Sequence, residues 1–217
     1  MQIASTEQLV QIPADHISLE GMLELPENPQ GIVLFAHGSG SSRLSPRNNF
    51  VARILREAGH GTLLIDLLTP DEDVNYENRF DISLLTRRLL AATHWLRHDP
   101  RTKALPIGYF GASTGAAAAL DAEAAIGGQI SAIVSRGGRP DLAGPEPLMQ
   151  VRCPTMLIVG GLDNEVIELN QQSYALISCE KELVIIPGAT HLFEEPGTLE
   201  QVAKHAARWF SRYLKPA

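Results

Sequence analysis

Residues 106–119, PIGYFGASTGAAAA, are the stretch around which the rest of the chain is organised. The apolar run at 107–110 predicts a short buried strand, and the alanine-rich run that follows predicts a helix packed close to it. Between them, Gly111, Ser113 and Gly115 form the pattern G-x-S-x-G. Glycine has no Cβ and adopts backbone angles that other residues resist, so these two positions permit a tight turn. The stretch therefore predicts a strand–turn–helix unit that holds the Ser113 hydroxyl above the end of a sheet.

Strands and helices alternate along most of the chain. Residues 8–14 and 17–25 predict two antiparallel N-terminal strands, because apolar and polar residues alternate along the second. From residue 31 onward the apolar runs predict strands at 31–36, 62–66, 107–110, 130–135, 155–160 and 183–186. Helical spacing of apolar residues predicts helices at 46–57, 82–98, 164–178 and 198–213, with a polar loop at 67–80. This order predicts an α/β fold with a mostly parallel sheet, right-handed crossovers and helices on both faces.

Size and composition indicate one domain, residues 1–217, since α/β folds of this length commonly stay single. The net charge is −7 and like charges do not run together, which argues against nucleic acid as a partner. No apolar run approaches the roughly 18 residues that cross a membrane, and the first residues lack a signal-peptide pattern, so a cytoplasmic protein is expected. Cys153 and Cys179 are outside any ligand-spaced motif and are interpreted as apolar thiols.

An acid and a base follow two later strands. Asp163 comes after the strand at 155–160, and His191 follows the strand at 183–186. The carboxyl ends of parallel strands meet at one edge of a sheet, where ligands bind. A serine hydroxyl becomes a useful nucleophile when a base takes its proton, as His191 could near neutral pH, with Asp163 orienting the imidazole. The chain order Ser113, Asp163, His191 thus predicts a catalytic triad at that edge.

The loop after the strand at 31–36 has the sequence HGSGSS and is a fourth element of the predicted site, beside the three triad residues. A loop at this place can donate one backbone N–H to an oxyanion hole, and the residue after the nucleophile donates a second. The backbone N–H groups of Ser39 and Thr114 are therefore predicted to stabilise an oxyanion. The short connection at residues 136–154 predicts an open site without a lid domain.

Several of these residues have a second interpretation. Asp163 could serve only as the N-cap of the following helix, and Glu165 could replace it as the acid. His37 precedes a glycine in a tight loop and is interpreted as structural. His94 and His98 are four residues apart, but no third ligand accompanies them, so no metal site is predicted.

Three arginines border the predicted site. Arg43 and Arg47 lie in the loop after His37 and Gly38, and Arg136 directly follows the strand at 130–135. The simple interpretation is a surface role or an ion pair to Asp66 or Asp141. The sharper hypothesis is that they bind a carboxylate on the substrate, for which the arginine geometry is suited.

With Ser113, Asp163, His191 and the His37 loop in place, the chain resembles the α/β-hydrolase superfamily, and within it the dienelactone hydrolase-like branch. The stretches GGLDNEV and GATHLFEEP, the chain length and the missing lid all resemble that branch, over roughly residues 31–214. Dienelactone hydrolases have a cysteine nucleophile where Ser113 stands, and an acidic residue near the position of His37. The resemblance implies the fold, the triad positions, and ester or lactone hydrolysis in general.

The sequence as a whole predicts a serine hydrolase acting on small carboxylic esters through an acyl-enzyme, with no metal or organic cofactor. A thioesterase, a small amide or peptide hydrolase and a cofactor-free perhydrolase would use the same machinery. A non-catalytic binding protein of the same fold is a rival of another class. The oligomeric state stays open.

Overall fold

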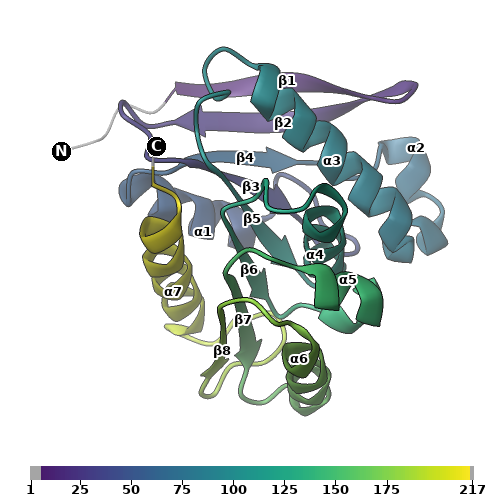
Figure 1. The fold of residues 1–217 in the computed structure, drawn as a ribbon, viewed down its shortest axis with the longest axis vertical. Coiled ribbons are helices and arrows are strands. Elements are labelled where there is room, and N and C mark those ends of the chain that lie inside the picture. The colour runs from purple at the N-terminus through teal and green to yellow at the C-terminus, as the bar shows by residue number, and fades with distance from the viewer. Residues whose placement is uncertain (1–5, 216–217) are drawn as a thin grey trace.

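The computed structural model describes residues 6–215, which fold around a single eight-stranded sheet (Figure 1). The strands lie in the order β1-β2-β4-β3-β5-β6-β7-β8. Their bounds are β1 Thr6–Ala14, β2 Ile17–Leu25, β3 Ile32–Ala36, β4 Gly61–Ile65, β5 Ile107–Ala112, β6 Ala132–Arg136, β7 Thr155–Gly160 and β8 Lys181–Ile186.

Pairing in the sheet changes direction at β4. The β1–β2 hairpin and the β2–β4 pair are antiparallel, whereas β4, β3, β5, β6, β7 and β8 pair in parallel. The parallel strands are all buried except β8 at the edge, which explains why they are continuous apolar runs in the sequence. The predicted α/β architecture with antiparallel N-terminal strands is confirmed.

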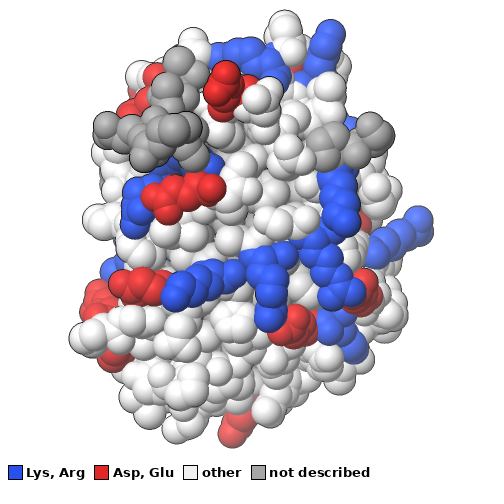
Figure 2. Space-filling model, turned by 90° about the vertical axis from the view of Figure 1, so that its left-hand side faces the viewer, with Lys and Arg blue, Asp and Glu red and all other residues white. Residues whose placement is uncertain are grey.

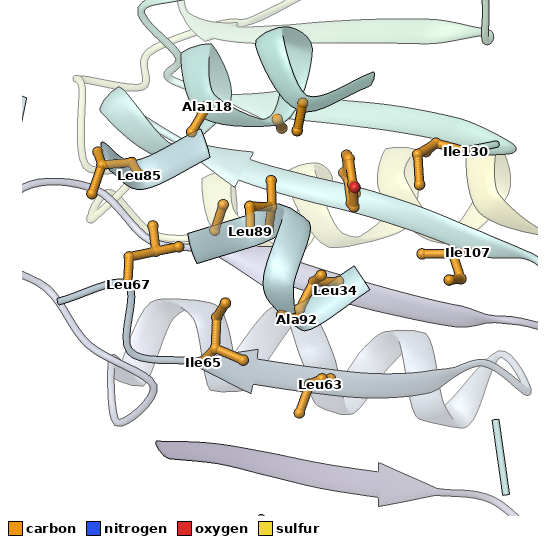
Figure 3. Close-up of a cluster of buried hydrophobic side chains, with 14 of the residues drawn as sticks. Leu34, Leu63, Ile65, Leu67, Leu85, Leu89, Ala92, Ile107, Ala118 and Ile130 are labelled. Atoms are coloured by element: carbon orange, nitrogen blue, oxygen red, sulfur yellow. The ribbon is translucent and has the colours of Figure 1, made fainter. Parts of the chain in front are cut away.

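Helices cover both faces of the sheet (Figure 1). Helices α1 (Pro46–Glu57) and α7 (Thr198–Tyr213) lie on one face, and α3 (Ile82–His98), α4 (Thr114–Ile126), α5 (Pro145–Gln150) and α6 (Asn164–Leu176) lie on the other. Each face has its own apolar core. Figure 3 shows the core under α3 and α4, where Leu85, Leu89 and Ala118 meet Leu34 and Ile65 of the sheet. The core on the opposite face is built on α1 and α7.

The loop predicted at residues 67–80 is partly helical. It contains α2 (Pro70–Asp73) and the 3-10 helix η1 (Tyr76–Phe80). Helix α2 begins with a capping box between Thr69 and Glu72, and the buried Arg88 of α3 binds the Glu72 carboxylate at 2.7 Å. The short helix therefore depends on a partner in α3, which a polar run of sequence does not reveal.

Strand boundaries differ by a few residues from the prediction. Strand β6 was expected at residues 130–135 but pairs with β5 only from Ala132 to Arg136. Ile130 is buried without belonging to the ladder, because it packs into the core as the chain enters the sheet. The connection from β6 to β7 contains only the 3-10 helix η2 (Pro140–Ala143) and α5, in agreement with the absence of a lid domain.

The outer surface carries charges of both signs. Figure 2 shows the side on which α7 lies, where blue side chains form a band across the middle and red side chains lie beside it. On α7, Arg208 pairs with Glu182 and Arg212 with Glu180, each at 3.0 Å. Among residues 6–215 there is no helix with the length and hydropathy that crossing a bilayer requires.

One buried histidine links stability to pH. His60, at the start of β4, is 1% exposed, and its Nε2 contacts Ser211 Oγ of α7 at 3.0 Å. Burial lowers the pKa of His60 from 6.5 to about 4. Below pH 6.5 His60 binds a proton in the unfolded chain but stays neutral in the folded one. The free energy of unfolding should therefore fall as the pH falls toward about 4. Urea midpoints measured at steps across this range should fall less steeply for His60→Gln than for the wild type; equal slopes would contradict the assignment.

Candidate active site

The turn around Ser113 is strained and tightly packed. Ser113 has φ 51° and ψ −121°, a positive-φ conformation that residues other than glycine rarely adopt. A Cβ on Gly111 would lie 2.5 Å from Ala116 Cα, and one on Gly115 would lie 2.1 Å from Ala36 O. Both glycines are therefore required for β5, α4 and the end of β3 to meet at this turn. Such strain concentrates at functional sites, where it fixes one side chain in place.

His191 and Asp163 are joined by a hydrogen bond. His191 Nδ1 lies 2.7 Å from Asp163 Oδ2, and the carboxylate is the more buried of the two. The loops that carry them are tied together, since Leu162 N–H donates to Ala189 O at 2.9 Å and Gly161 N–H donates to Ile186 O at 2.8 Å. With Nδ1–H donating to the carboxylate, Nε2 is left as the free nitrogen of the imidazole.

The contacts of Asp163 and Glu165 differ. Asp163 occupies the N-cap position of α6, but its side chain makes no capping hydrogen bond there. Its carboxylate contacts His191 instead. Glu165 is exposed in the first turn of α6 and makes no hydrogen bond to His191 among the described contacts.

Ser113 and His191 line one cavity of about 180 Å³ at the carboxyl edge of the sheet. Its wall also contains Gly38, Ser39, Ser41, Arg47, Ala112, Arg136, Gly137 and Leu192. Within residues 6–215 no hydrogen bond joins the Ser113 hydroxyl to the imidazole. Such contacts are often long in a free enzyme and tighten when substrate binds.

His37 holds the loop that faces Ser113. Its Nδ1 donates to Gly38 O, and its Nε2 accepts the Leu67 N–H, each at 2.9 Å. Both ring nitrogens are therefore used, and burial lowers the pKa of His37, which keeps the ring neutral. The structural interpretation of His37 agrees with these contacts. The N–H groups of Ser39 and Thr114 donate no described hydrogen bond, so both are available to a ligand.

Gly38 sets the distance between this loop and the nucleophile turn. A Cβ on Gly38 would lie 2.8 Å from Ser113 Cβ and 3.1 Å from Ala112 O. We expect Gly38→Ala to lower kcat for ester hydrolysis by about 10²- to 10³-fold, the loss seen when one oxyanion donor is removed. Steady-state kinetics would measure it. Ser39→Ala keeps its backbone N–H and should stay within about threefold of wild type; an equal loss in both variants would mean that the loop acts through the serine side chain.

The three predicted arginines have different surroundings. Arg43 does not line the Ser113 cavity: it pairs with Asp66, and with Glu20 at 2.5 Å, beside a separate hollow. The structure thus corrects its assignment as a substrate-binding residue and favours the ion-pair interpretation. Arg47 lines the cavity and pairs with Glu194 at 3.0 Å.

Arg136 lines the cavity without an acidic partner. It is 7% exposed, and the one described hydrogen bond of its side chain joins Nη2 to Asn48 Oδ1 at 3.3 Å. Its Nε is buried with no partner, and Asp141, once considered for an ion pair, binds Arg139. Burial and the nearby charge of Arg47 lower the pKa of Arg136 to about 10. The guanidinium nonetheless remains charged at neutral pH, and no carboxylate among residues 6–215 pairs with it.

Comparison with known proteins identifies the family. A scan against family models finds no match. A solved dienelactone hydrolase from Anabaena variabilis superposes with a TM-score of 0.94 at 52% sequence identity, over 97% of this chain and 99% of that one. The chain belongs to the dienelactone hydrolase family. The resemblance inferred from the sequence is thereby confirmed.

Other proteins similar to this chain either have a lower sequence identity or are about twice as long. The esterase Est1E from Butyrivibrio proteoclasticus shares the fold at 18% identity with a TM-score of 0.80, over 94% of this chain and 98% of that one. Proteins from two Mycobacterium tuberculosis strains, provisionally named phosphoribosyl transferases, are 57% identical over 96% of this chain but only 47% of their own length. The chain thus spans about half the length of these curated relatives. The solved structures similar to this chain include the dienelactone hydrolase and, at 18–21% identity and for the fold alone, esterases.

Sequence reasoning missed three residues of this dienelactone hydrolase-family site. Asn48 anchors Arg136, Glu194 pairs with Arg47, and the Phe193 ring lies 5.9 Å from the Arg136 guanidinium carbon. Phe193 and Glu194 directly follow His191 and its neighbour in the HLFEEP stretch, which was the signal available. No group of three or more His, Cys, Asp or Glu side chains in the described part of the chain is arranged to hold a metal ion.

Proposed function

We propose that the chain is a serine hydrolase of carboxylic esters that acts through an acyl-enzyme. The observation that carries the proposal is the shared cavity, where the strained Ser113 turn faces a histidine already bonded to Asp163 at 2.7 Å. No other pairing of a base with a nucleophile is needed to account for the site. Lactone hydrolysis would follow the same steps.

Each step can be assigned to a group in the cavity. Ser113 Oγ attacks the ester carbonyl while His191 Nε2 takes its proton, and the imidazolium passes that proton to the leaving alcohol. Asp163 stabilises the imidazolium and keeps the tautomer. The Ser39 and Thr114 N–H groups would stabilise the oxyanion. A water molecule, deprotonated by His191, then attacks the acyl-enzyme and releases the acid.

A substrate panel tests the proposal. p-Nitrophenyl esters, lactones, thioesters, amides and an ester with added hydrogen peroxide should be compared under one set of conditions, with hydrolysis of oxyesters expected to give the highest kcat/KM. Faster turnover of thioesters, of amides or of peroxide would favour the thioesterase, amidase or perhydrolase alternative. No turnover of any acyl substrate would favour the non-catalytic binding protein.

The assigned base predicts a pH profile. Measured between about pH 5 and 8, kcat/KM should rise with pH, since a histidine base accepts the serine proton only in its neutral form. Initial rates on a neutral ester would measure this without a change in substrate charge. A profile that stays flat over the same range would remove His191 from the assigned role.

We further propose that preferred esters carry an anionic group, bound by Arg136 and Arg47. Arg136 is buried in the cavity wall without a counter-ion, and an isolated buried charge is costly unless a ligand compensates it. A guanidinium binds carboxylate or phosphate oxygens through charge-assisted hydrogen bonds. Esters bearing a carboxylate or a phosphate would distinguish the two anions.

The transferase name of the longer relatives raises a second question. We propose that phosphoribosyl transfer belongs to the part of those proteins that this chain does not match, because the matching part has the fold of solved hydrolases. The 217-residue chain alone should hydrolyse esters without any phosphoribosyl donor. Phosphoribosyl transfer by this chain, in the same assay, would overturn that division.

A further inference from the structure

Glu194 is an acidic side chain that pairs with Arg47, a residue lining the cavity that we propose for anions. Its carboxylate binds Arg47 Nη1 at 3.0 Å, with the Glu194 side chain 63% and the Arg47 side chain 34% exposed. Arg136, the second cation of the cavity wall, has no acidic partner among the described contacts. Glu194 therefore occupies one of two guanidinium groups that a substrate anion would use.

The backbone next to Glu194 is strained. Phe193, which precedes Glu194, has φ 56°, a conformation that bulky residues adopt only as outliers. Its ring is 2% exposed and lies 5.9 Å from the Arg136 guanidinium carbon. The strained turn packs Phe193 into the core under α1 and α7 and turns the next side chain to Arg47. A carboxylate placed here by a strained residue, two positions after Leu192 of the cavity wall, calls for an explanation beyond solubility.

The chemistry of ester hydrolysis supplies one. Water and a neutral ester group give an alcohol, a carboxylate and a proton, so the acid product carries one more negative charge than the substrate. Two free guanidinium groups would then hold the product more tightly than the substrate. An internal carboxylate on Arg47 weakens both complexes and lets the product leave.

We infer that Glu194 is a specificity-determining residue, which competes with the substrate and product anions for Arg47. This inference rests on the proposed anion site. The Glu194–Arg47 pair is exposed and therefore weak, so a substrate or product anion can displace Glu194. A rival role is a clamp: the same pair links the His191 loop to α1 and could simply hold the imidazole in place.

The Glu194→Gln variant separates these roles when it is measured with an anionic ester (monoethyl succinate), a neutral ester (ethyl butyrate) and the product anion succinate. Titration calorimetry gives the Kd of succinate without any turnover, and hydrolysis of the two esters gives KM and kcat. We expect the succinate Kd to fall about fivefold and the KM of monoethyl succinate by a similar factor, the equivalent of one exposed ion pair. The KM and kcat of ethyl butyrate should stay within about twofold of wild type. Glu57→Gln removes an exposed partner of Arg53 on α1 and is the matched control, with no expected change.

The outcomes are distinct. An unchanged succinate Kd in Glu194→Gln would overturn the inference, and an equal fall in kcat on both esters with that Kd unchanged would assign the clamp role instead. Tighter succinate binding without hydrolysis of either ester would support the competition by Glu194 while rejecting the proposed esterase function. If succinate also binds more tightly to Glu57→Gln, the change in net charge explains the effect, and the inference is overturned.

Discussion

Replacing Ser113 with alanine should lower kcat for ester hydrolysis by about 10⁵- to 10⁶-fold, the loss seen when a serine nucleophile of a triad is removed. The cause is that His191 and Asp163 then activate nothing that can form an acyl-enzyme. Steady-state rates on a p-nitrophenyl ester would measure the loss. Folding should be unaffected, since alanine fits the turn at least as easily as serine, and circular dichroism would check this.

Ser41→Ala is the matched control, because Ser41 lines the same cavity but is outside the proposed triad. Its activity should stay within about threefold of wild type. If kcat falls by less than about tenfold in Ser113→Ala, another group carries the reaction. A large loss in Ser41→Ala would point to that second hydroxyl.

Arg136→Met should make the protein more stable and less selective. Replacing a buried charge that lacks an ionic partner by an apolar side chain of similar length is expected to raise the free energy of unfolding by about 1–4 kcal/mol. The same change removes charge-assisted hydrogen bonds to an anionic substrate, which should lower kcat/KM for monoethyl succinate by about 10- to 100-fold. Turnover of ethyl butyrate should change little. Urea denaturation and kinetics on both esters measure the two effects.

Arg43→Met provides the comparison, because it removes an arginine whose carboxylate partners are Asp66 and Glu20, outside the Ser113 cavity. It should lower stability, since two carboxylates lose their partner, and leave the preference between the two esters unchanged. Equal losses on the anionic and neutral esters in Arg136→Met would reject the anion site. Lower stability of Arg136→Met would show that the guanidinium is compensated in the free protein.

The parts of the fold that depend on local sequence could be predicted from it. Gly111 and Gly115 flank Ser113 at positions where a Cβ would clash with neighbouring backbone, and the glycines are visible in the sequence. The alternation of apolar runs and amphipathic stretches likewise predicted the parallel sheet. Asp163 and His191 were found because parallel strands bring their carboxyl ends to one edge.

What depends on distant partners could not be predicted. Arg43 and Arg136 look alike in the sequence, but the carboxylates that neutralise Arg43 come from β2 and from the residue after β4, while none reaches Arg136. Helix α2 is held partly by Arg88 of α3, but its capping box between Thr69 and Glu72 was a local signal that the sequence interpretation did not use. The Arg47–Glu194 pair joins residues far apart in the chain and appears only once the sheet is assembled.

Covalent labelling by a fluorophosphonate tests the central claim most directly. Such a probe reacts with a serine only when a neighbouring base activates it, so intact mass and peptide mapping should find one adduct, on Ser113. The same treatment of Ser113→Ala should give no adduct, and His191→Ala should label far more slowly. An unlabelled wild type under conditions that label a control esterase, or an adduct that persists in Ser113→Ala, would contradict the assignment of Ser113 as the nucleophile.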